Sequence, residues 1–224
     1  MLKIETKING LNYWVSGENP RLIIHSGTHG DEYEVTKFVS KYVNKYEKIL
    51  PPFIFVPEVS PTAISQKTRE NGLGHDMNRS FFSDSTDPEI IANLEIIKNN
   101  QVELFVSFHE DPPIDEYYVY DIGYEEVENR IVQDHNQLLK RIGIKLLTGI
   151  DDIEDPGLGY EFRDGYNITV YPKDMPENGS ISSWLFKRNI TKEYLLPEIP
   201  GLADKKTKDI IVDTFFSEVI LKMF

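Results

Sequence analysis

Residues 21–32 read Arg-Leu-Ile-Ile-His-Ser-Gly-Thr-His-Gly-Asp-Glu, and they decide the fold. The run from Leu22 to Ser26 is apolar and β-branched, which favours a strand, and the Gly-Thr-His-Gly segment after it indicates a turn. Beyond the turn, residues 35–46 carry apolar side chains at intervals of three and four, which predicts an amphipathic helix with one buried stripe. A strand, a turn and a helix in this order are typical of an α/β protein.

Strands and helices continue to alternate along the rest of the chain. We expect strands near residues 2–7, 10–16, 20–26, 52–57, 103–108, 116–121, 167–172 and 192–197. We expect helices near residues 31–48, 87–99, 124–142, 179–188 and 204–223. The alternation predicts an α/β fold in which a mixed sheet of parallel and antiparallel strands has helices on both faces. Residues 1–224 should form a single domain, because such folds often run undivided to about 200–250 residues.

Three side chains are candidates for a metal site. His29 follows a predicted strand, Glu32 lies in the first turn of the next helix, and His109 ends the strand pattern at 103–108. Ligands gather at the carboxyl ends of strands in open α/β sheets, so these three can converge on one cation. Each alone has an ordinary explanation, such as a loop histidine or a carboxylate favoured by the helix dipole. Together they predict one metal ion.

Two imidazoles and one carboxylate are typical of a catalytic zinc site, because a fourth position stays open for water. Bound zinc lowers the pKa of that water to about 7 and yields a nucleophile at neutral pH. We expect Glu198, in Leu-Leu-Pro-Glu-Ile-Pro-Gly at 195–201, to accept the proton. Cysteine is absent, so neither disulfides nor a thiolate metal site can form.

These motifs, with Asp-Met-Asn-Arg at 76–79, resemble the zinc carboxypeptidase family, whose pattern is His-x-x-Glu, Asp-x-Asn-Arg, a distant His and then a Glu. Gly-Thr-His-Gly-Asp-Glu at 27–32 and Ser-Phe-His-Glu at 107–110 are similar to the short branch that includes murein tripeptide amidase. The related aspartoacylase and succinylglutamate desuccinylase group shares the metal pattern. The resemblance spans about residues 20–201 and implies a zinc carboxypeptidase-like fold.

The resemblance also implies roles for individual residues. Asn78 and Arg79 match the pair that holds the substrate's free carboxylate, a task suited to a planar guanidinium. Arg69 is the plausible match to the arginine that polarises the scissile carbonyl and stabilises the oxyanion. Asp76 is expected to orient His29 through its other ring nitrogen. The less favoured explanations are a surface ion pair for Arg79 and for Arg69 and an ordinary turn residue for Asn78.

Two stretches depart from the family pattern: residues 60–63, and residues 196–200 around Glu198, which are only partly similar to murein tripeptide amidases. Ser-Pro-Thr-Ala at 60–63 stands where relatives often have Asn-Pro-Asp-Gly, which leaves the substrate open. Residues 60–82 and 151–179 are expected as loops, and the second has the length of a lid over the site or of a solvated excursion. Tyr160, Tyr166 and Tyr171 are equal candidates for a tyrosine that contacts substrate.

The remaining histidines have ordinary interpretations. His25 is expected inside a strand, His75 in a loop and His135 in a helix, and none of them is assigned to the metal. Tyr117, Tyr118 and Tyr120 alternate in a strand pattern, so packing accounts for them. Glu110, which follows His109, could orient it or be a turn carboxylate.

Net charge limits the partners of this chain. The formal charge of −13 argues against nucleic acid, because phosphate binding needs a basic face. Charges interrupt the first seven residues, and no stretch reaches the roughly 18 apolar residues that cross a bilayer. We therefore expect a cytoplasmic protein that binds neither membranes nor nucleic acid. The oligomeric state is open.

The sequence thus favours a zinc-dependent hydrolase, a metallocarboxypeptidase or amidase, that cleaves an amide bond next to a residue with a free carboxylate. The substrate would be a small peptide. An N-acyl amino acid, cleaved by the aspartoacylase type of deacylase, is the alternative within the same chemistry. A binding module that has lost catalysis is the alternative of another class.

Overall fold

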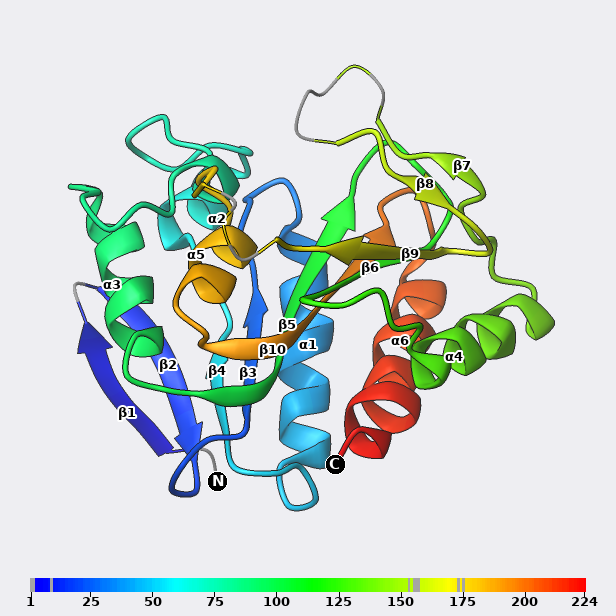
Figure 1. Ribbon diagram of the computed structural model, residues 1–224, viewed down its shortest axis with the longest axis horizontal. Helices are drawn as coiled ribbons and strands as arrows, with labels where there is room; N and C mark the ends of the chain where they lie inside the picture. Colours follow the sequence, from blue (N-terminus) through cyan, green and yellow to red (C-terminus); the bar gives the residue numbers. More distant parts are fainter. Residues whose placement is uncertain (1–2, 9, 153, 155–157, 173, 175) are drawn as a thin grey trace.

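A computed structural model describes residues 3–8, 10–152, 154, 158–172, 174 and 176–224. Its main sheet has the strand order β1-β2-β4-β3-β5-β10-β6-β9 (Figure 1). The strands are β1 (Lys3–Ile8), β2 (Leu11–Ser16), β4 (Phe53–Val56), β3 (Leu22–Ser26), β5 (Val102–Asp111), β10 (Thr191–Pro200), β6 (Tyr118–Gly123) and β9 (Tyr166–Val170). β4, β3, β5 and β10 run parallel, while β2 and β6 are antiparallel to their neighbours β4 and β10. The predicted mixed sheet is confirmed.

Helices cover both faces of this sheet, as predicted (Figure 1). They are α1 (Tyr33–Tyr46), α2 (Pro61–Gln66), α3 (Pro88–Ile97), α4 (Arg130–Arg141), α5 (Ile181–Lys187) and α6 (Lys205–Thr214). One apolar cluster packs α3 and α5 against the sheet, and a second packs α1, α4 and α6 against the other face. Within the described part of the chain, no helix combines the length and apolarity needed to span a membrane.

The central strands are buried on both faces, which explains their continuous apolar sequences. Every residue of β3 and of β4 is buried, and so are residues 104–110 of β5. Helices on both faces of a parallel sheet produce this pattern. Because β3, β5 and β10 run parallel, their carboxyl ends lie together at one edge of the sheet.

The structure differs from the sequence prediction mainly in the segments expected as loops. The short helix α2 and a 3₁₀ turn, η1 (Met77–Arg79), lie within residues 60–82. Ser60 caps α2 by accepting a hydrogen bond from the Ala63 amide, and Pro61 occupies its first turn. Serine followed by proline is a helix-start signal, but six residues are too few to show apolar periodicity.

Two other departures are smaller. The expected closing helix at 204–223 is α6 followed by the π-helical η2 (Phe215–Val219) and the 3₁₀ turn η3 (Ile220–Lys222). A two-stranded sheet pairs β7 (Gly149–Ile150), just before the 151–179 segment, with β8 (Glu161–Phe162) inside it. Strands of two residues carry no periodic signal, so the sequence does not reveal them.

Candidate active site

The loop between β3 and α1 carries His29 and Glu32 to the carboxyl edge of the sheet. It packs so closely on residues 63–68 that a Cβ on Gly30 would lie 1.8 Å from the Ala63 carbonyl oxygen. The Gly30 amide donates to the Thr68 carbonyl at 2.8 Å, which ties the loop down. Glycine at position 30 is therefore a steric requirement for placing the neighbouring His29.

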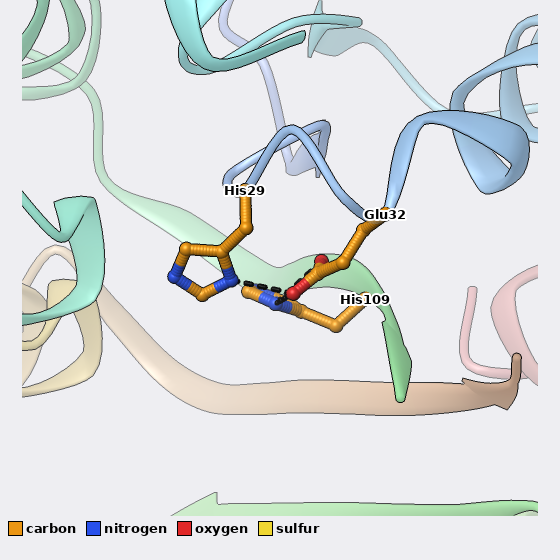
Figure 2. Close-up of side chains that lie close together, drawn as sticks. All are labelled: His29, Glu32 and His109. Atoms are coloured by element: carbon orange, nitrogen blue, oxygen red, sulfur yellow. Dashed lines mark hydrogen bonds and ion pairs between the residues drawn. The ribbon is translucent and has the colours of Figure 1, made fainter. Parts of the chain in front are cut away.

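His29, Glu32 and His109 meet as the sequence predicted. Figure 2 shows the Glu32 carboxylate close to both imidazoles, with His29 and Glu32 on the loop and His109 on β5. The Nδ1 atom of His29 lies 2.5 Å from Oε1 of Glu32, and Nδ1 of His109 lies 3.1 Å from Oε2. One ligand atom from each residue falls within 4.8 Å of the others, and all three side chains are buried. Among the described residues this is the one cluster with metal-binding geometry.

The donor set suits a divalent cation. Two imidazole nitrogens and a carboxylate are typical of zinc and of other borderline divalent metals. Burial opposes charge on Glu32, but the imidazoles of His109 and His29 hold its pKa well below its ordinary value. Burial likewise disfavours the cationic form of His29, yet Glu32 and Asp76 raise its pKa to about 9. Glu32 thus carries the negative charge of the cluster, and His29 must release a proton when its nitrogen binds a cation.

Asp76 lies behind His29, as predicted. Its Oδ1 is 3.1 Å from Nε2 of His29, which leaves Nδ1 directed at Glu32. Its Oδ2 accepts a hydrogen bond from Nε of Arg69 at 3.0 Å, and its Oδ1 also accepts from the Asn78 amide at 2.8 Å. Burial opposes ionisation of Asp76, but His29, Arg69 and Arg79 hold its pKa far below the ordinary value.

Glu198 is placed beside His109 by strand pairing. β10 and β5 are parallel neighbours, and Glu198 and His109 are register partners in this pair. Paired residues of adjacent strands project to the same face. Burial raises the pKa of the Glu198 carboxyl well above its ordinary value, Glu32 and Asp111 raise it further, and Arg69 lowers it. A high pKa is suited to a carboxylate that must accept a proton and return it.

One cavity of about 760 Å³ contains every residue predicted for the site. Its lining includes His29, Glu32, Arg69, Asn78, Arg79, His109 and Glu198. A larger cavity of about 1080 Å³ is lined by other residues, among them Asp121 and Glu193. We assign the chemistry to the smaller cavity, because it holds the metal-binding cluster.

Parts of the 151–179 segment border this cavity. Asp151, Asp152, Leu158, Tyr160 and Asn178 are among its lining residues. Whether the segment acts as a lid stays a prediction, and residues 153, 155–157, 173 and 175 lie outside the described part.

Of the three tyrosines considered as substrate contacts, Tyr160 lines the cavity, and the other two do not. Tyr166 donates its hydroxyl hydrogen to Asp121, and Tyr171 donates to the Pro176 carbonyl.

Sequence reasoning missed two other tyrosines of the site. Tyr118 and Tyr120 pack in the core, as expected, but they also line the cavity. Tyr118 donates to Asp111 at 2.6 Å, and Tyr120 donates to Asp151 at 2.5 Å. Their alternation with Val119 predicts a strand. Only the pairing of β6 with β10 shows that Tyr118 and Tyr120 lie on the face of the sheet that carries Glu198.

The histidines set aside on sequence grounds lie outside the cluster. His75 pairs with Asp87 at 2.8 Å, and His135 contacts Thr214 at 3.0 Å. His25 is buried in β3, where burial and the nearby His109 lower its pKa to about 3. Glu110 does not bond to the His109 ring and instead accepts a hydrogen bond from Lys208 at 2.7 Å.

Comparisons with known proteins agree with this geometry. Residues 18–117 match the model of the succinylglutamate desuccinylase/aspartoacylase catalytic domain family. A proposed metallopeptidase from Shewanella amazonensis superposes with a TM-score of 0.75 at 18% identity, over 100% of this chain and 86% of that chain. No curated protein matches the sequence.

Two further solved structures are a carboxypeptidase and a member of the desuccinylase/aspartoacylase group. A metallo-carboxypeptidase from Burkholderia cenocepacia gives a TM-score of 0.64 at 15% identity, over 95% of this chain and 61% of that chain. A succinylglutamate desuccinylase/aspartoacylase from Rhodobacter sphaeroides gives 0.58 at 17% identity, over 95% and 58%. These likenesses show the fold and confirm the resemblance noted in the sequence.

Proposed function

We propose that this protein is a metal-dependent hydrolase that cleaves an amide bond next to a residue with a free carboxylate, with zinc as the metal. The observation that carries the proposal is the convergence of the His29, Glu32 and His109 cluster with Glu198 in one cavity. The binding-module alternative has less support, because a decayed site should lack a ligand or the base.

Each residue of the proposed site has a separate role in the reaction. Zinc held by the cluster would supply Lewis acidity and lower the pKa of a water molecule. Glu198 takes the proton of the attacking water and returns it to the leaving amine. Arg69 donates to the developing oxyanion, and Asn78 with Arg79 binds the substrate carboxylate.

Charge in the cavity favours a substrate with one carboxylate over an N-acylated acidic amino acid. Among the described lining residues, Arg69 and Arg79 share the cavity with seven carboxyl groups, of which Glu110 is already paired with Lys208. These carboxyl groups belong to Asp31, Glu32, Glu110, Asp111, Asp151, Asp152 and Glu198. An N-acyl aspartate or glutamate brings at least two carboxylates, and the second would enter a negative field without a cationic partner. We therefore place a peptide or peptide-like amide first and the N-acyl amino acid second, although the family match to residues 18–117 keeps the second in the test.

Amine release from a panel of murein tripeptide, dipeptides, N-acetylaspartate and N-succinylglutamate, with zinc supplied, tests this choice. Turnover of the peptides supports the proposal, whereas turnover confined to the N-acyl acids moves the protein to the deacylase type. No turnover of any substrate would favour the binding module.

Glu198→Gln tests the mechanism directly. Because glutamine cannot accept the proton, kcat should fall by about 10²–10⁴-fold while zinc remains bound. Glu193→Gln is the matched control, since Glu193 lies on the same strand but lines the other cavity. Undiminished turnover in Glu198→Gln would contradict the mechanism.

A further inference from the structure

Four buried polar atoms beneath the metal cluster have no hydrogen-bond partner among the described residues. They are Nε2 of His25, Oγ of Ser107, Nε2 of His109 and the hydroxyl oxygen of Tyr194. None of the four residues is more than 2% exposed. Buried polar atoms in folded proteins nearly always have a partner, so four together require an explanation.

The four groups come from three neighbouring strands and share one face of the sheet. His25 of β3 and Ser107 of β5 are register partners, and Ser107 precedes His109 by two positions on the same strand. Tyr194 of β10 is the register partner of Phe105, which lies two positions before Ser107. Residues two apart on a strand project to the same face, so all four side chains lie above the same part of the sheet.

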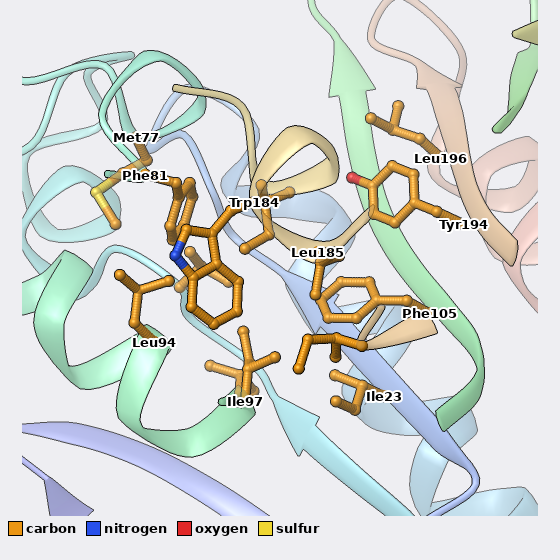
Figure 3. Packing of buried hydrophobic residues seen from close by; sticks show 14 of the residues in the cluster. Ile23, Met77, Phe81, Leu94, Ile97, Phe105, Trp184, Leu185, Tyr194 and Leu196 are labelled. Atoms are coloured by element: carbon orange, nitrogen blue, oxygen red, sulfur yellow. The ribbon is translucent and has the colours of Figure 1, made fainter. Parts of the chain in front are cut away.

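Two of these side chains, His25 and Tyr194, pack against the same ring, that of Phe105. The Phe105 ring lies between its neighbours, with centroids 4.6 Å from His25 and 5.4 Å from Tyr194. Figure 3 shows the Tyr194 hydroxyl at the end of its ring that points away from Phe105. Burial raises the pKa of Tyr194 and the Ser107 hydroxyl lowers it, which places these two hydroxyls near each other, although neither has a hydrogen-bond partner among the described residues.

The Nε2 hydrogen of His109 needs a hydrogen-bond acceptor when Nδ1 binds a metal. Its Nδ1 faces Glu32, so a metal bound to the cluster takes the Nδ1 lone pair and leaves the ring hydrogen on Nε2. A metal-bound imidazole almost always donates its other N–H to a carboxylate, a carbonyl or water, and this bond fixes the ring's orientation. His29 has Asp76 for this purpose, whereas among the described residues Nε2 of His109 has no such partner.

We propose that His25, Ser107, His109 and Tyr194 bind a buried water molecule, which accepts the Nε2 hydrogen of His109 and holds the ring in position for the metal. One water offers two donors and two acceptors, which equals the four groups to be satisfied. His109 and Tyr194 act as donors to it, and Ser107 and the neutral imidazole of His25 act as acceptors. His25, Ser107 and Tyr194 are thus positioning residues, which act through His109.

A crystal structure of the metal-free protein, at a resolution that shows ordered waters, tests the site itself. The expected result is a water within hydrogen-bond distance of at least three of the four atoms. Direct hydrogen bonds among the four groups, or the absence of ordered density between them, would overturn the inference. This measurement does not depend on the identity of the metal or of the substrate.

Zinc affinity tests the positioning role, which rests on the proposed metal-dependent function. Ser107→Ala and Tyr194→Phe should each weaken zinc binding about 10-fold in competition with a chelator, because removing a group that orients a ligand typically costs 10–100-fold. Circular dichroism at the assay temperature verifies that each variant is folded.

Tyr117→Phe is the matched control, because the buried Tyr117 hydroxyl also lacks a partner in the described part of the chain but packs in the cluster on the other face. It should bind zinc as the wild type does. Wild-type affinity in Ser107→Ala and Tyr194→Phe would refute the positioning role. A wild-type protein that binds no zinc would contradict the proposed function, while the crystallographic result would still decide whether the water site exists.

Discussion

At the scale of single residues, Asp76 connects the candidate metal ligand His29 with Arg69 and Asn78, which are proposed to contact substrate. It contacts the ring of His29, the guanidinium of Arg69 and the backbone amide of Asn78. The Asp76 carboxylate thus helps to position His29, Arg69 and Asn78. Because such contacts orient a ligand rather than bind the metal, their loss should weaken the site without unfolding the chain.

Asp76→Asn should lower zinc affinity by about 10–100-fold, because the amide is a weaker acceptor for the Nε2 hydrogen of His29 and no longer carries the negative charge that stabilises its orientation. Competition with a chelator measures the change. Asp84→Asn, a substitution at an exposed residue of the same region, is the control and should leave affinity unaltered. Equal affinity in Asp76→Asn and the wild type would show that Asp76 has no part in holding His29.

At the scale of elements, α6 is attached to the edge of the sheet that carries the metal cluster by a buried ion pair. Nζ of Lys208 lies 2.7 Å from Glu110 and 3.0 Å from Glu34, which is in the first turn of α1. Lys208 is only 2% exposed, and Glu110 5%. Removal of one partner from a buried pair leaves an uncompensated charge, so this contact should matter more than the exposed pairs nearby.

Lys208→Met should lower the free energy of unfolding by about 3 kcal/mol, the lower end of the range for breaking a buried pair. Urea denaturation measures it. Lys205→Met is the control, since Lys205 lies on the same helix and faces the same Glu34 at 3.8 Å but is 80% exposed. The control should change stability by no more than about 0.5 kcal/mol. Similar losses in the two variants would show that burial of the pair is not decisive.

At the scale of the whole molecule, two carboxyl groups away from the metal cluster affect the pH dependence of stability. Burial raises the pKa of Asp121 to about 6, and burial with the nearby Asp121 raises that of Glu193 to about 7. Tyr166 donates to Asp121, and Asn129 donates to Glu193. The folded chain therefore holds these protons more tightly than the unfolded chain does.

The sign of the effect follows from this difference. The contribution of each group to stability is fully present below its unfolded pKa, near 4, and is lost as pH rises through 6 to 7. Glu193→Gln keeps an acceptor for Asn129 and removes the charge, so it should match the wild type at pH 4 and exceed it by up to about 3 kcal/mol at pH 8. Urea denaturation at several pH values measures the difference. Glu18→Gln, at an exposed residue, should reproduce the wild-type profile, and a Glu193→Gln curve parallel to it would refute the prediction.

The sequence by itself determined the elements whose signal is local. The apolar run at 22–26 and the period after it located β3 and α1, and the motifs located the candidate ligands His29, Glu32 and His109. The short helix α2 and the β7-β8 pair escaped prediction, because segments of two to six residues have no measurable period.

Only the tertiary structure decided how distant strands align. The register of β10 on β5 sets Glu198 beside His109, and the pairing of β6 with β10 brings Tyr118 and Tyr120 to the same cavity. The unpartnered atoms of His25, Ser107 and Tyr194 were invisible for the same reason. A strand pattern in the sequence indicates which residues of one strand share a face. Their neighbours on adjacent strands depend on strand order and register, and these are determined jointly by side chains far apart in the chain.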